Sequence, residues 1–433
     1  MVAPQGFTAA GVFCDIKRLG TGKGSDKGPK RDLALILSEA PATVAGLFTT
    51  NQTCAAPVKV CVERVKRGRA RAVVVNSGNA NACTGREGLR DAREMVDLTE
   101  RVLSLPVGTA LVGSTGRIGV QMPMGNVRAG ITAAAAELGA TVDHAARAVE
   151  AIMTSDSRPK QIAVEFKLDG RVTRLGGMCK GAGMIQPGMS PTGRRPASSP
   201  LHATMLGFVT TDAAVTAPAL RAALREAVAR SLNRITVDGD MSTNDTVLVL
   251  ANGLAGDPKA PLRDPGSAAF APFQAALNHV CLALAKMIVR DGEGVSRFVT
   301  VRVEGARSFA DADAASRAVA NSSLVKTSWC GGDPNWGRII DAIGYSAAKV
   351  VEEKVDIGYS APGSRKILWS LRRGQPTKAT FKELCAAVAP REFDLHIRLN
   401  LGSASALMYA ADLTEEYVAF NKGDVADPNS LGG

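Results

Sequence analysis

Six short segments of the chain are rich in glycine, asparagine, aspartate and threonine, and they follow apolar, strand-like runs. They are VNSGNANACTG (75–85), GSTGRIG (113–119), KGAGMIQPGM (180–189), DGDMSTNDT (238–246), DGEGVSRF (291–298) and CGGDPNWGR (330–338). Each one alone is better explained as an ordinary turn, and none matches the P-loop or the dinucleotide-binding glycine pattern in context. Together they indicate several close approaches of the backbone to a small polar ligand.

A seventh segment, SSPLHATMLGFVTTDA (198–213), changes from small polar residues to an apolar, β-prone run at Thr204. A threonine hydroxyl is a weak nucleophile until a base activates it, and one such base is the threonine's own α-amine once it is N-terminal. A free α-amine has a pKa of about 7.7–8.0, which suits proton transfer near neutral pH. This chemistry requires a cut between Ala203 and Thr204. Composition alone leaves open an ordinary threonine at the first position of a strand.

Composition argues against several other classes of function. The net charge is +11, but aromatic residues make up only 4% of the chain and no nucleic-acid-binding signature is found, so we expect no nucleic-acid partner. No run of about 18 apolar residues occurs, so we expect no membrane span, and the N-terminus does not resemble a secretory signal. The eight cysteines are scattered without C-x-x-C or Cys/His spacing, which predicts buried free thiols and no metal site.

Secondary structure patterns surround these segments. Residues 32–38, 71–77 and 297–306 read as strands, while 88–105, 216–234 and 273–292 read as helices, the second capped by Thr216 and the third buried. Residues 23–30 and 190–202 are rich in Gly, Pro and charge and read as surface loops. Strands and helices mix without a strict βαβ rhythm, which favours an α+β layered sandwich.

Seven motifs follow one another along the chain: VNSGNANACTG, STGRIG, KGAGMIQPGM followed by ATMLGFVTTDA, DGDMSTNDT, DGEG, SSLVKT with GGDPNWGR, and DLTEEYV. They occur in the order seen in the ornithine acetyltransferase (glutamate N-acetyltransferase) family of arginine biosynthesis, and the chain resembles that family from about Gln5 to about Asn421. The resemblance implies a layered α/β/β/α sandwich, as in that family and in related self-cleaving aminopeptidases, with a C-terminal α/β lobe from about residue 300.

The resemblance also implies roles for individual residues. Thr204 is similar to the family's self-processed nucleophile, so cleavage after Ala203 would give an α chain of residues 1–203 and a β chain of residues 204–433. Thr115 and Gly116 resemble the oxyanion-hole pair, which supplies one hydroxyl and one backbone N–H. The substrate-binding positions of the family, besides the nucleophile, fall on Thr154, Lys180, Glu293 and Asn421. Lys180 suits an amino-acid α-carboxylate and Glu293 suits the ornithine side-chain ammonium.

Three departures from the family pattern stand out. Thirteen residues, 190–202, intervene between the P-x-M turn and ATML, where the family usually joins the two directly. The family's TTDT reads TSDS at 154–157. A substrate-binding Thr or Ser usually lies five residues beyond the asparagine, but here that offset holds Ala426, and Ser430 is the nearest candidate replacement.

The implied reaction transfers an acetyl group from N-acetylornithine to glutamate by a ping-pong route through acetyl-Thr204, without cofactor or metal. Some family members also make N-acetylglutamate from acetyl-CoA, and the motifs do not separate the two types. The resemblance further implies that α and β chains stay together as a heterotetramer or larger assembly. We expect the protein in the cytoplasm, or in the mitochondrial matrix or plastid stroma of a eukaryote. Two alternatives stay open here: a self-cleaving amidase or aminopeptidase that uses water as acceptor, and a basic non-enzymatic binding protein.

Overall fold

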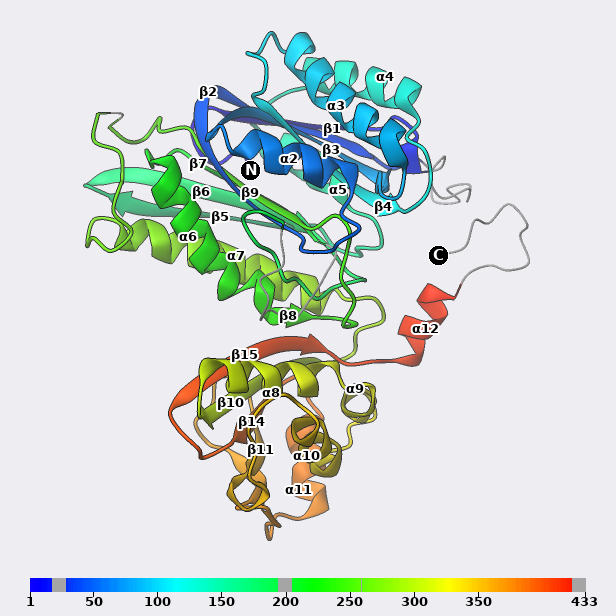
Figure 1. Cartoon of the computed structure of the whole chain (residues 1–433), viewed down its shortest axis with the longest axis vertical. Helices are drawn as coiled ribbons and strands as arrows, with labels where there is room; N and C mark the ends of the chain where they lie inside the picture. The colour runs from blue at the N-terminus through cyan, green and yellow to red at the C-terminus, as the bar shows by residue number, and fades with distance from the viewer. Residues whose placement is uncertain (18–28, 194–204, 258, 423–433) are drawn as a thin grey trace. The chain divides into compact units, whose positions relative to one another are not determined.

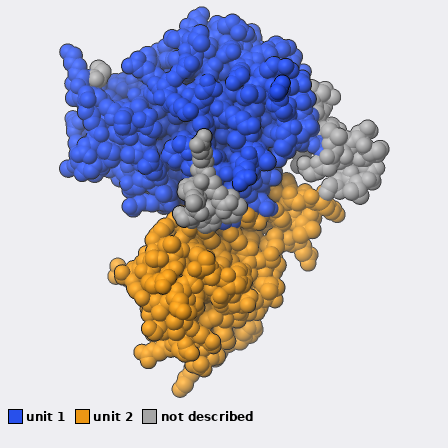
Figure 2. Space-filling view, viewed as in Figure 1, with its two compact units in different colours: residues 1–233, 240–288, 423–433 blue, residues 234–239, 289–422 orange. Residues whose placement is uncertain are grey.

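The computed structural model describes residues 1–17, 29–193, 205–257 and 259–422, which form two compact units (Figures 1 and 2). The first unit takes the residues up to 233 together with 240–288. The second takes 234–239 and 289–422. Each unit is built around one mixed β-sheet with helices against it, so the predicted α+β class is confirmed.

The sheet of the first unit has eight strands in the order β4-β3-β2-β9-β7-β6-β5, with β1 paired to β2. Their bounds are β1 (Phe7–Val12), β2 (Leu33–Phe48), β3 (Arg69–Asn79), β4 (Ala110–Arg117), β5 (Lys160–Leu168), β6 (Arg171–Lys180), β7 (Leu206–Thr211) and β9 (Thr246–Ala251). The pairs β3·β4 and β7·β9 are parallel and the others are antiparallel. The strands predicted at 32–38 and 71–77 are therefore present.

Strand β2 is much longer than the predicted 32–38, because the chain continues as a strand past an irregular stretch. Its pairing with β3 shifts register between Leu37 and Ala42. Pro41 lies within that stretch and has no N–H to donate to the sheet. Beyond it, residues 43–48 pair with β9, whereas residues 33–38 pair with β1. Strand β2 therefore joins the two parts of the sheet, one formed by β1, β3 and β4 and the other by β9, β7, β6 and β5.

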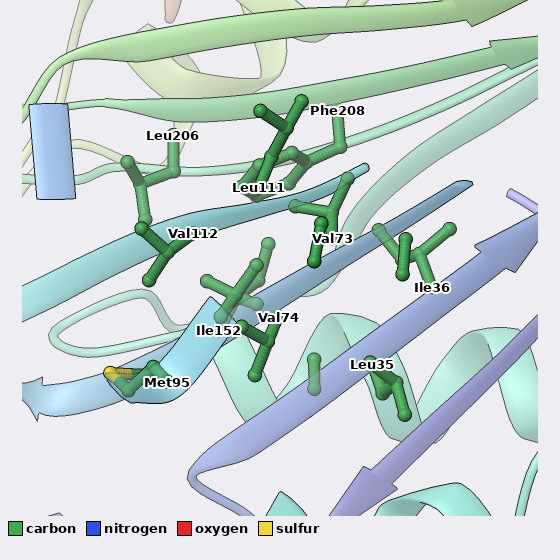
Figure 3. Close-up of a cluster of buried hydrophobic side chains, with 14 of the residues drawn as sticks. Leu35, Ile36, Val73, Val74, Met95, Leu111, Val112, Ile152, Leu206 and Phe208 are labelled. Atoms are coloured by element: carbon green, nitrogen blue, oxygen red, sulfur yellow. The ribbon is translucent and has the colours of Figure 1, made fainter. Parts of the chain in front are cut away.

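The two parts of this sheet pack face to face. Figure 3 shows Leu206 and Phe208 of β7 beside Leu111 and Val112 of β4, and all of these side chains belong to one buried cluster. The approach is close at Gly113 of β4, where an added Cβ would lie 3.2 Å from the Phe208 ring. Burial of large apolar side chains between the layers supplies roughly 1.5–3 kcal/mol each.

Helices cover the outer faces of both layers. They are α2 (Ala56–Val65), α3 (Gly85–Val102), α4 (Met124–Ala136), α5 (Val142–Ile152), α6 (Ala217–Ala229) and α7 (Ala271–Arg290). On one side α5 lies so close to β1 that a Cβ at Gly11 would meet the Arg147 carbonyl oxygen at 2.1 Å. On the other side Gly177 of β6 faces Val280 and Leu284 of α7. The layers follow the predicted α/β/β/α order.

The helix predictions are confirmed with shifted ends. Helix α3 occupies the range predicted at 88–105, and α7 occupies that at 273–292. Helix α6 ends at Ala229, short of the predicted 234, and a 3₁₀ turn, η1 (Leu232–Arg234), follows. There the side chain of Asn233 accepts a hydrogen bond from the Met189 N–H at 3.1 Å. Thr216 is the N-cap residue of α6, as predicted, but its side chain makes no capping bond.

Helix α7 needs separate mention because it is long and apolar. Within the described residues it alone has the length and hydropathy of a membrane-spanning helix, and half of that apolar stretch is buried inside the fold. Phe273, Leu277, Val280, Leu284 and Ile288 form its buried face. It is a core helix of the first unit, as the sequence pattern predicted.

The second unit contains a seven-stranded sheet in the order β13-β12-β11-β14-β10-β15-β8. Its strands are β8 (Ile235–Thr236), β10 (Phe298–Ala306), β11 (Asp356–Ser360), β12 (Leu368–Arg372), β13 (Gln375–Pro376), β14 (Glu392–Arg398) and β15 (Ala404–Ala411). Its helices are α8 (Phe309–Asn321), α9 (Ser323–Cys330), α10 (Trp336–Gly344), η2 (Glu352–Lys354), α11 (Phe381–Val388) and α12 (Glu415–Asn421). The alternation seen in the sequence buries Val299, Val301 and Val303 of β10, which confirms the strand predicted at 297–306.

Two segments predicted as surface loops are only partly described. Residues 29 and 30 of the first loop are exposed, and the rest of 23–30 lies outside the described residues. Within 190–202, residues 190–193 are described. Ser190 pairs with Phe48 through two backbone hydrogen bonds of 2.9 Å, so the extra segment starts from a fixed point on β2.

Candidate active site

Thr115 and Gly116 lie at the end of β4, where its pairing with β3 becomes irregular. Asn79 of β3 pairs with both Thr115 and Arg117. Gly116 has a φ of 123°, and an added Cβ would lie 2.4 Å from the carbonyl carbon of Gly78. Only glycine fits this backbone, which gives the STG sequence a physical reason. The strand end places a threonine hydroxyl next to a glycine N–H, the two donors expected of an oxyanion hole.

Asn244, just before β9, holds this strand end in place. Its side-chain Nδ2 donates to the Ser114 carbonyl at 2.8 Å and to the Ala80 carbonyl at 2.6 Å. The hydroxyl of Thr243 donates to the Asn244 Oδ1 at 2.6 Å and thereby fixes the amide orientation. Asn244 was not predicted as a site residue, although the DGDMSTNDT segment that contains it was noted in the sequence.

Thr154 and Lys180 are brought together by a third residue, Asp156, which the sequence reasoning did not single out. Asp156 Oδ1 accepts from the Lys160 Nζ at 2.6 Å and from the Gly181 N–H at 2.7 Å. Its Oδ2 accepts from the Thr154 N–H at 3.0 Å and lies 4.0 Å from the Lys180 Nζ. The chain after α5 is thereby joined to the end of β6.

The charges in this cluster are buried. Lys160 is 1% exposed and Lys180 is 2% exposed. Burial by itself would raise the pKa of Asp156, but the positive charges of Lys180 and Lys160 and the Gly181 N–H outweigh it and bring that pKa to about 2. Asp156 is therefore an anion between two lysines at neutral pH. Asp156, Lys160 and Lys180 together carry one negative and two positive charges, and a lysine ammonium is a group that binds carboxylates.

Strands β3 and β4 are also linked to the end of α5, through Ser77 of β3. The Ser77 hydroxyl of β3 donates to the Ala151 carbonyl at 2.6 Å, and Ser77 pairs with Thr115 on β4. The segment leading to Thr154 is thus fixed to the strands that carry Thr115 and Gly116. These contacts bring four predicted residues, Thr115, Gly116, Thr154 and Lys180, onto one connected framework.

The predicted nucleophile Thr204, with Ala203, lies outside the described residues, but the residue after it is described. Met205 donates its N–H to the Asp245 carboxylate oxygen Oδ1, and its carbonyl accepts from the Thr246 N–H at 3.1 Å. Leu206 then pairs with Lys180 on one side and with Thr246 on the other. The start of β7 is therefore held between β6 and β9, beside Lys180.

Asp245 itself is fully buried, and its second oxygen, Oδ2, has no hydrogen-bond partner among the described residues. Burial raises its pKa well above the usual range, although the Met205 N–H and the charge of Lys180 act in the opposite direction. Asp245 was also missed in the sequence, where it stands in the same DGDMSTNDT segment as Asn244. Of the residues that the sequence reasoning missed, Asp245 is the most important, because its carboxyl group contacts the residue that follows the predicted cleavage point.

Glu293 and Asn421, the two other predicted substrate contacts, belong to the second unit. The Asn421 Nδ2 donates to the Glu293 Oε2 at 2.9 Å. Their segments are joined at Gly294, whose carbonyl accepts from the Thr414 hydroxyl at 2.7 Å and whose added Cβ would lie 2.4 Å from the Tyr417 nitrogen. Ala426 and Ser430, the positions in question beyond α12, lie outside the described residues.

The cysteines and candidate metal ligands add little to this site. All eight cysteines are free thiols: Cys61, Cys179 and Cys281 are buried, but Cys83 is exposed, so the expectation of uniformly buried thiols was wrong. Cys83 adopts a φ of 55° in the turn that follows β3. Across the described ranges, no group of three or more His, Cys, Asp and Glu side chains is arranged to hold a metal ion.

Comparison with known proteins gives a match along nearly the whole length. The model of the ArgJ family matches residues 9–423. This chain belongs to the ArgJ family. A relative named arginine biosynthesis bifunctional protein ArgJ, from Symbiobacterium thermophilum, is 47% identical over 97% of both chains. A relative named glutamate N-acetyltransferase, from Methanocaldococcus jannaschii, is 40% identical over 97% of both chains.

Among solved structures, an ArgJ bifunctional protein from Bacillus halodurans is 39% identical, with a TM-score of 0.47, over 50% of this chain and 99% of that one. The family model and the two relatives confirm, at the level of the ArgJ family, the resemblance read from the motifs. Of the predicted site residues, the oxyanion pair and the substrate positions Thr154 and Lys180 lie in the first unit. The substrate positions Glu293 and Asn421 lie in the second.

Proposed function

We propose that this ArgJ-family chain is an acetyltransferase of arginine biosynthesis that moves an acetyl group from N-acetyl-L-ornithine to L-glutamate through an acetyl ester on Thr204. The observation that carries this proposal is the buried cluster around Asp156, which joins Thr154 and Lys180, taken with the whole-length relationship to proteins named for this chemistry. Lys180 supplies the positive charge for the α-carboxylate that both substrates share.

Activity depends on a prior cut between Ala203 and Thr204, which frees the α-amine of Thr204. The hydroxyl then attacks the acetyl carbonyl of N-acetylornithine while its proton passes to that amine. Thr115 and Gly116 donate hydrogen bonds to the oxyanion that forms on the carbonyl oxygen. An amide has a poor leaving group, so one oxyanion donor, worth roughly 3–4 kcal/mol, has a large effect on the rate. The amine proton then moves to the departing nitrogen, and ornithine leaves.

The second half-reaction runs the same steps in reverse with a different amine. The α-amine of glutamate attacks the acetyl-threonine ester, Thr115 and Gly116 again stabilise the oxyanion, and the threonine hydroxyl is restored. Glu293 and Asn421 keep the substrate-binding roles that the family resemblance implies, in which Glu293 pairs with the ornithine side-chain ammonium. The reaction uses no cofactor in this scheme, and the use of acetyl-CoA as a second acetyl donor is a separate property to be measured.

The processed chains, residues 1–203 and 204–433, stay associated in this proposal, in a heterotetramer or larger assembly. Strands β6 and β7 support this, because they pair along six residues yet lie on opposite sides of the cut. The partners are small molecules rather than nucleic acid or membrane. We place the enzyme in the cytoplasm of a prokaryote or the interior of a eukaryotic organelle. A relative from Candida albicans is named as mitochondrial.

Intact-mass measurement followed by a product assay tests the proposal. The purified protein should give two chains of residues 1–203 and 204–433, and Thr204→Ala should give one uncut, inactive chain. Incubation with N-acetylornithine should then release ornithine and make N-acetylglutamate only when glutamate is present. Release of free acetate in place of N-acetylglutamate would identify an amidase, and full activity in an uncut chain would refute the threonine mechanism.

A further inference from the structure

Helix α12, which ends at the predicted substrate contact Asn421, is packed very little against the rest of its unit (Figure 1). The structure describes all of its residues from Glu415 to Asn421, and none of them is buried. Tyr417 is the one residue among them that is not exposed. Isolated helices shorter than about 12 residues are marginally stable in water. The position of α12, and with it the position of Asn421, therefore depends on a few specific contacts.

The start of α12 is fixed to the loop that carries Glu293. The Thr414 hydroxyl accepts the Tyr417 N–H at 3.1 Å and donates to the Gly294 carbonyl at 2.7 Å. Only a residue without a Cβ permits this approach, because an added Cβ on Gly294 would lie 2.4 Å from the Tyr417 nitrogen. These contacts hold the first turn of the helix. The last turn, which carries Asn421, must be held by other groups.

The side chain of Tyr417 provides such a contact. Its hydroxyl donates to the Asp238 carboxylate oxygen Oδ2 at 3.2 Å. Residues four apart lie on the same face of a helix, and the Tyr417 carbonyl accepts from the Asn421 Nδ2 at 3.0 Å. The same Nδ2 donates to the Glu293 Oε2 at 2.9 Å. A chain of contacts thus runs from Asp238 through Tyr417 and Asn421 to Glu293.

Asp238 is a firm anchor for this chain of contacts, because its own segment is bound to a strand and a helix of the second unit. The preceding strand β8 pairs with β15, and the Thr236 hydroxyl donates to the Asn321 Oδ1 of α8 at 2.9 Å. The Thr236 hydroxyl also accepts the Gly239 N–H at 3.2 Å and so closes the turn that contains Asp238. Burial lowers the pKa of Lys326 to about 8, and the negative charge of Asp238 acts in the opposite direction. A substitution of Asp238 would therefore disturb more than α12.

We propose that Tyr417 is a positioning residue for recognition of the N-acetylornithine side chain. Its hydroxyl, held by Asp238, fixes the last turn of α12, so that Asn421 orients the Glu293 carboxylate toward the side-chain ammonium. Tyr417 acts through these two residues and does not itself have to touch the substrate. This inference rests on the proposed function, because it concerns the support of two substrate contacts in that reaction.

The test is Tyr417→Phe, which removes the hydroxyl and keeps the aromatic ring. Steady-state formation of N-acetylglutamate is measured with N-acetyl-L-ornithine and with N-acetyl-L-norvaline, which has the same carbon chain but no side-chain ammonium. We expect kcat/KM for N-acetylornithine to fall at least about tenfold, mainly through KM, because a hydrogen bond to a charged group is lost. The value for N-acetylnorvaline should not change. An unchanged preference for N-acetylornithine over N-acetylnorvaline would overturn the proposal.

This preference is a ratio of two rates of one enzyme sample, so it does not depend on how much of the variant is folded. Tyr345→Phe is the matched control, since Tyr345 belongs to the same unit but is 62% exposed. It should keep the wild-type preference. A loss as large as that of Tyr417→Phe would show that the effect is not specific to α12, and the proposal would be wrong.

A double variant tests whether Tyr417 acts through Glu293. Glu293→Gln alone should remove most of the preference for N-acetylornithine, so adding Tyr417→Phe should lower it no further. Independent effects would instead add in free energy, and that result would contradict the assigned role. A wild type that forms no N-acetylglutamate from N-acetylornithine would count against the proposed function. Normal wild-type transfer with an unchanged preference in Tyr417→Phe counts only against this inference.

Discussion

Replacement of Asp156 by asparagine tests how much the buried charges around Asp156 contribute to the free energy of unfolding. The substitution removes the negative charge that lies 2.6 Å from the Lys160 Nζ and 4.0 Å from the Lys180 Nζ, and both lysines are buried. Breaking a buried ion pair by removing one partner typically costs 3–5 kcal/mol, because the other charge stays buried without compensation. Here two buried lysines, Lys160 and Lys180, would both lose this carboxylate as a partner.

The pKa of Asp156 gives a second, independent magnitude. Its shift from 3.8 in the unfolded chain to about 2 in the folded one corresponds to about 2.4 kcal/mol of stability at neutral pH. Because the folded pKa is the lower of the two, this contribution is complete above pH 3.8 and is lost as the pH falls toward 2. We therefore expect Asp156→Asn to lower the free energy of unfolding by about 2.5–5 kcal/mol at pH 7, with a difference that shrinks on acidification.

Urea unfolding in the uncut Thr204→Ala background measures this effect, with circular dichroism following the backbone. All three tryptophans, Trp329, Trp336 and Trp369, lie in the second unit, so their fluorescence reports that unit separately and serves as an internal control. Asp143→Asn is the matched variant, since Asp143 also forms an i,i+4 ion pair, with Arg147 at 2.6 Å, but is 63% exposed. Exposed pairs are worth at most about 1 kcal/mol. If the two variants lost the same stability, the buried-charge reasoning would be refuted.

Four further predictions concern activity. Lys180→Met should lower kcat/KM for both N-acetylornithine and glutamate at least about 30-fold, the equivalent of about 2 kcal/mol; steady-state kinetics in which only one substrate suffers would contradict a shared α-carboxylate site. Glu293→Gln can still accept the hydrogen bond from Asn421, yet it should weaken N-acetylornithine use by a similar factor, and an unchanged donor KM would argue against its pairing with the ornithine ammonium. Gly116→Ala should reduce acetyl transfer at least about 100-fold, because its Cβ would meet the Gly78 backbone at 2.4 Å; wild-type turnover would exclude Gly116 from the oxyanion hole. Deletion of residues 190–202 should leave cleavage and transfer nearly unchanged, since a longer loop costs only about 0.6 kcal/mol per doubling, and a tenfold change in the KM for glutamate would instead indicate that the segment gates the substrate.

The order of the motifs along the chain was sufficient to predict the family and the layered α+β fold, and local sequence patterns predicted three of the strands and three of the helices. These features depend on short stretches of sequence. The alternation in residues 299–303 places Val299, Val301 and Val303 in the hydrophobic core of the second unit, and the glycine after Thr115 is required by a local backbone conformation. Periodicity and special backbone angles are properties of neighbouring residues, so a sequence reveals them directly. Even so, the sequence pattern ended β2 at residue 38, because Pro41 interrupts the pattern of a strand that continues by pairing with β3 and β9.

The sequence did not reveal which side chains make contacts between residues that are far apart in the chain. Asp156 contacts the Gly181 N–H across 25 positions, Asp245 contacts Met205 across 40, and Asn244 contacts the carbonyls of Ala80 and Ser114 across 164 and 130. In the sequence each is one more polar residue in a turn-like segment. Their buried charges and hydrogen bonds exist only once β4, β6, β7 and β9 have assembled, because burial and charge pairing are set by distant neighbours. The sequence therefore determined the chemistry to expect, and the tertiary structure decided which carboxyl and amide groups hold it in place.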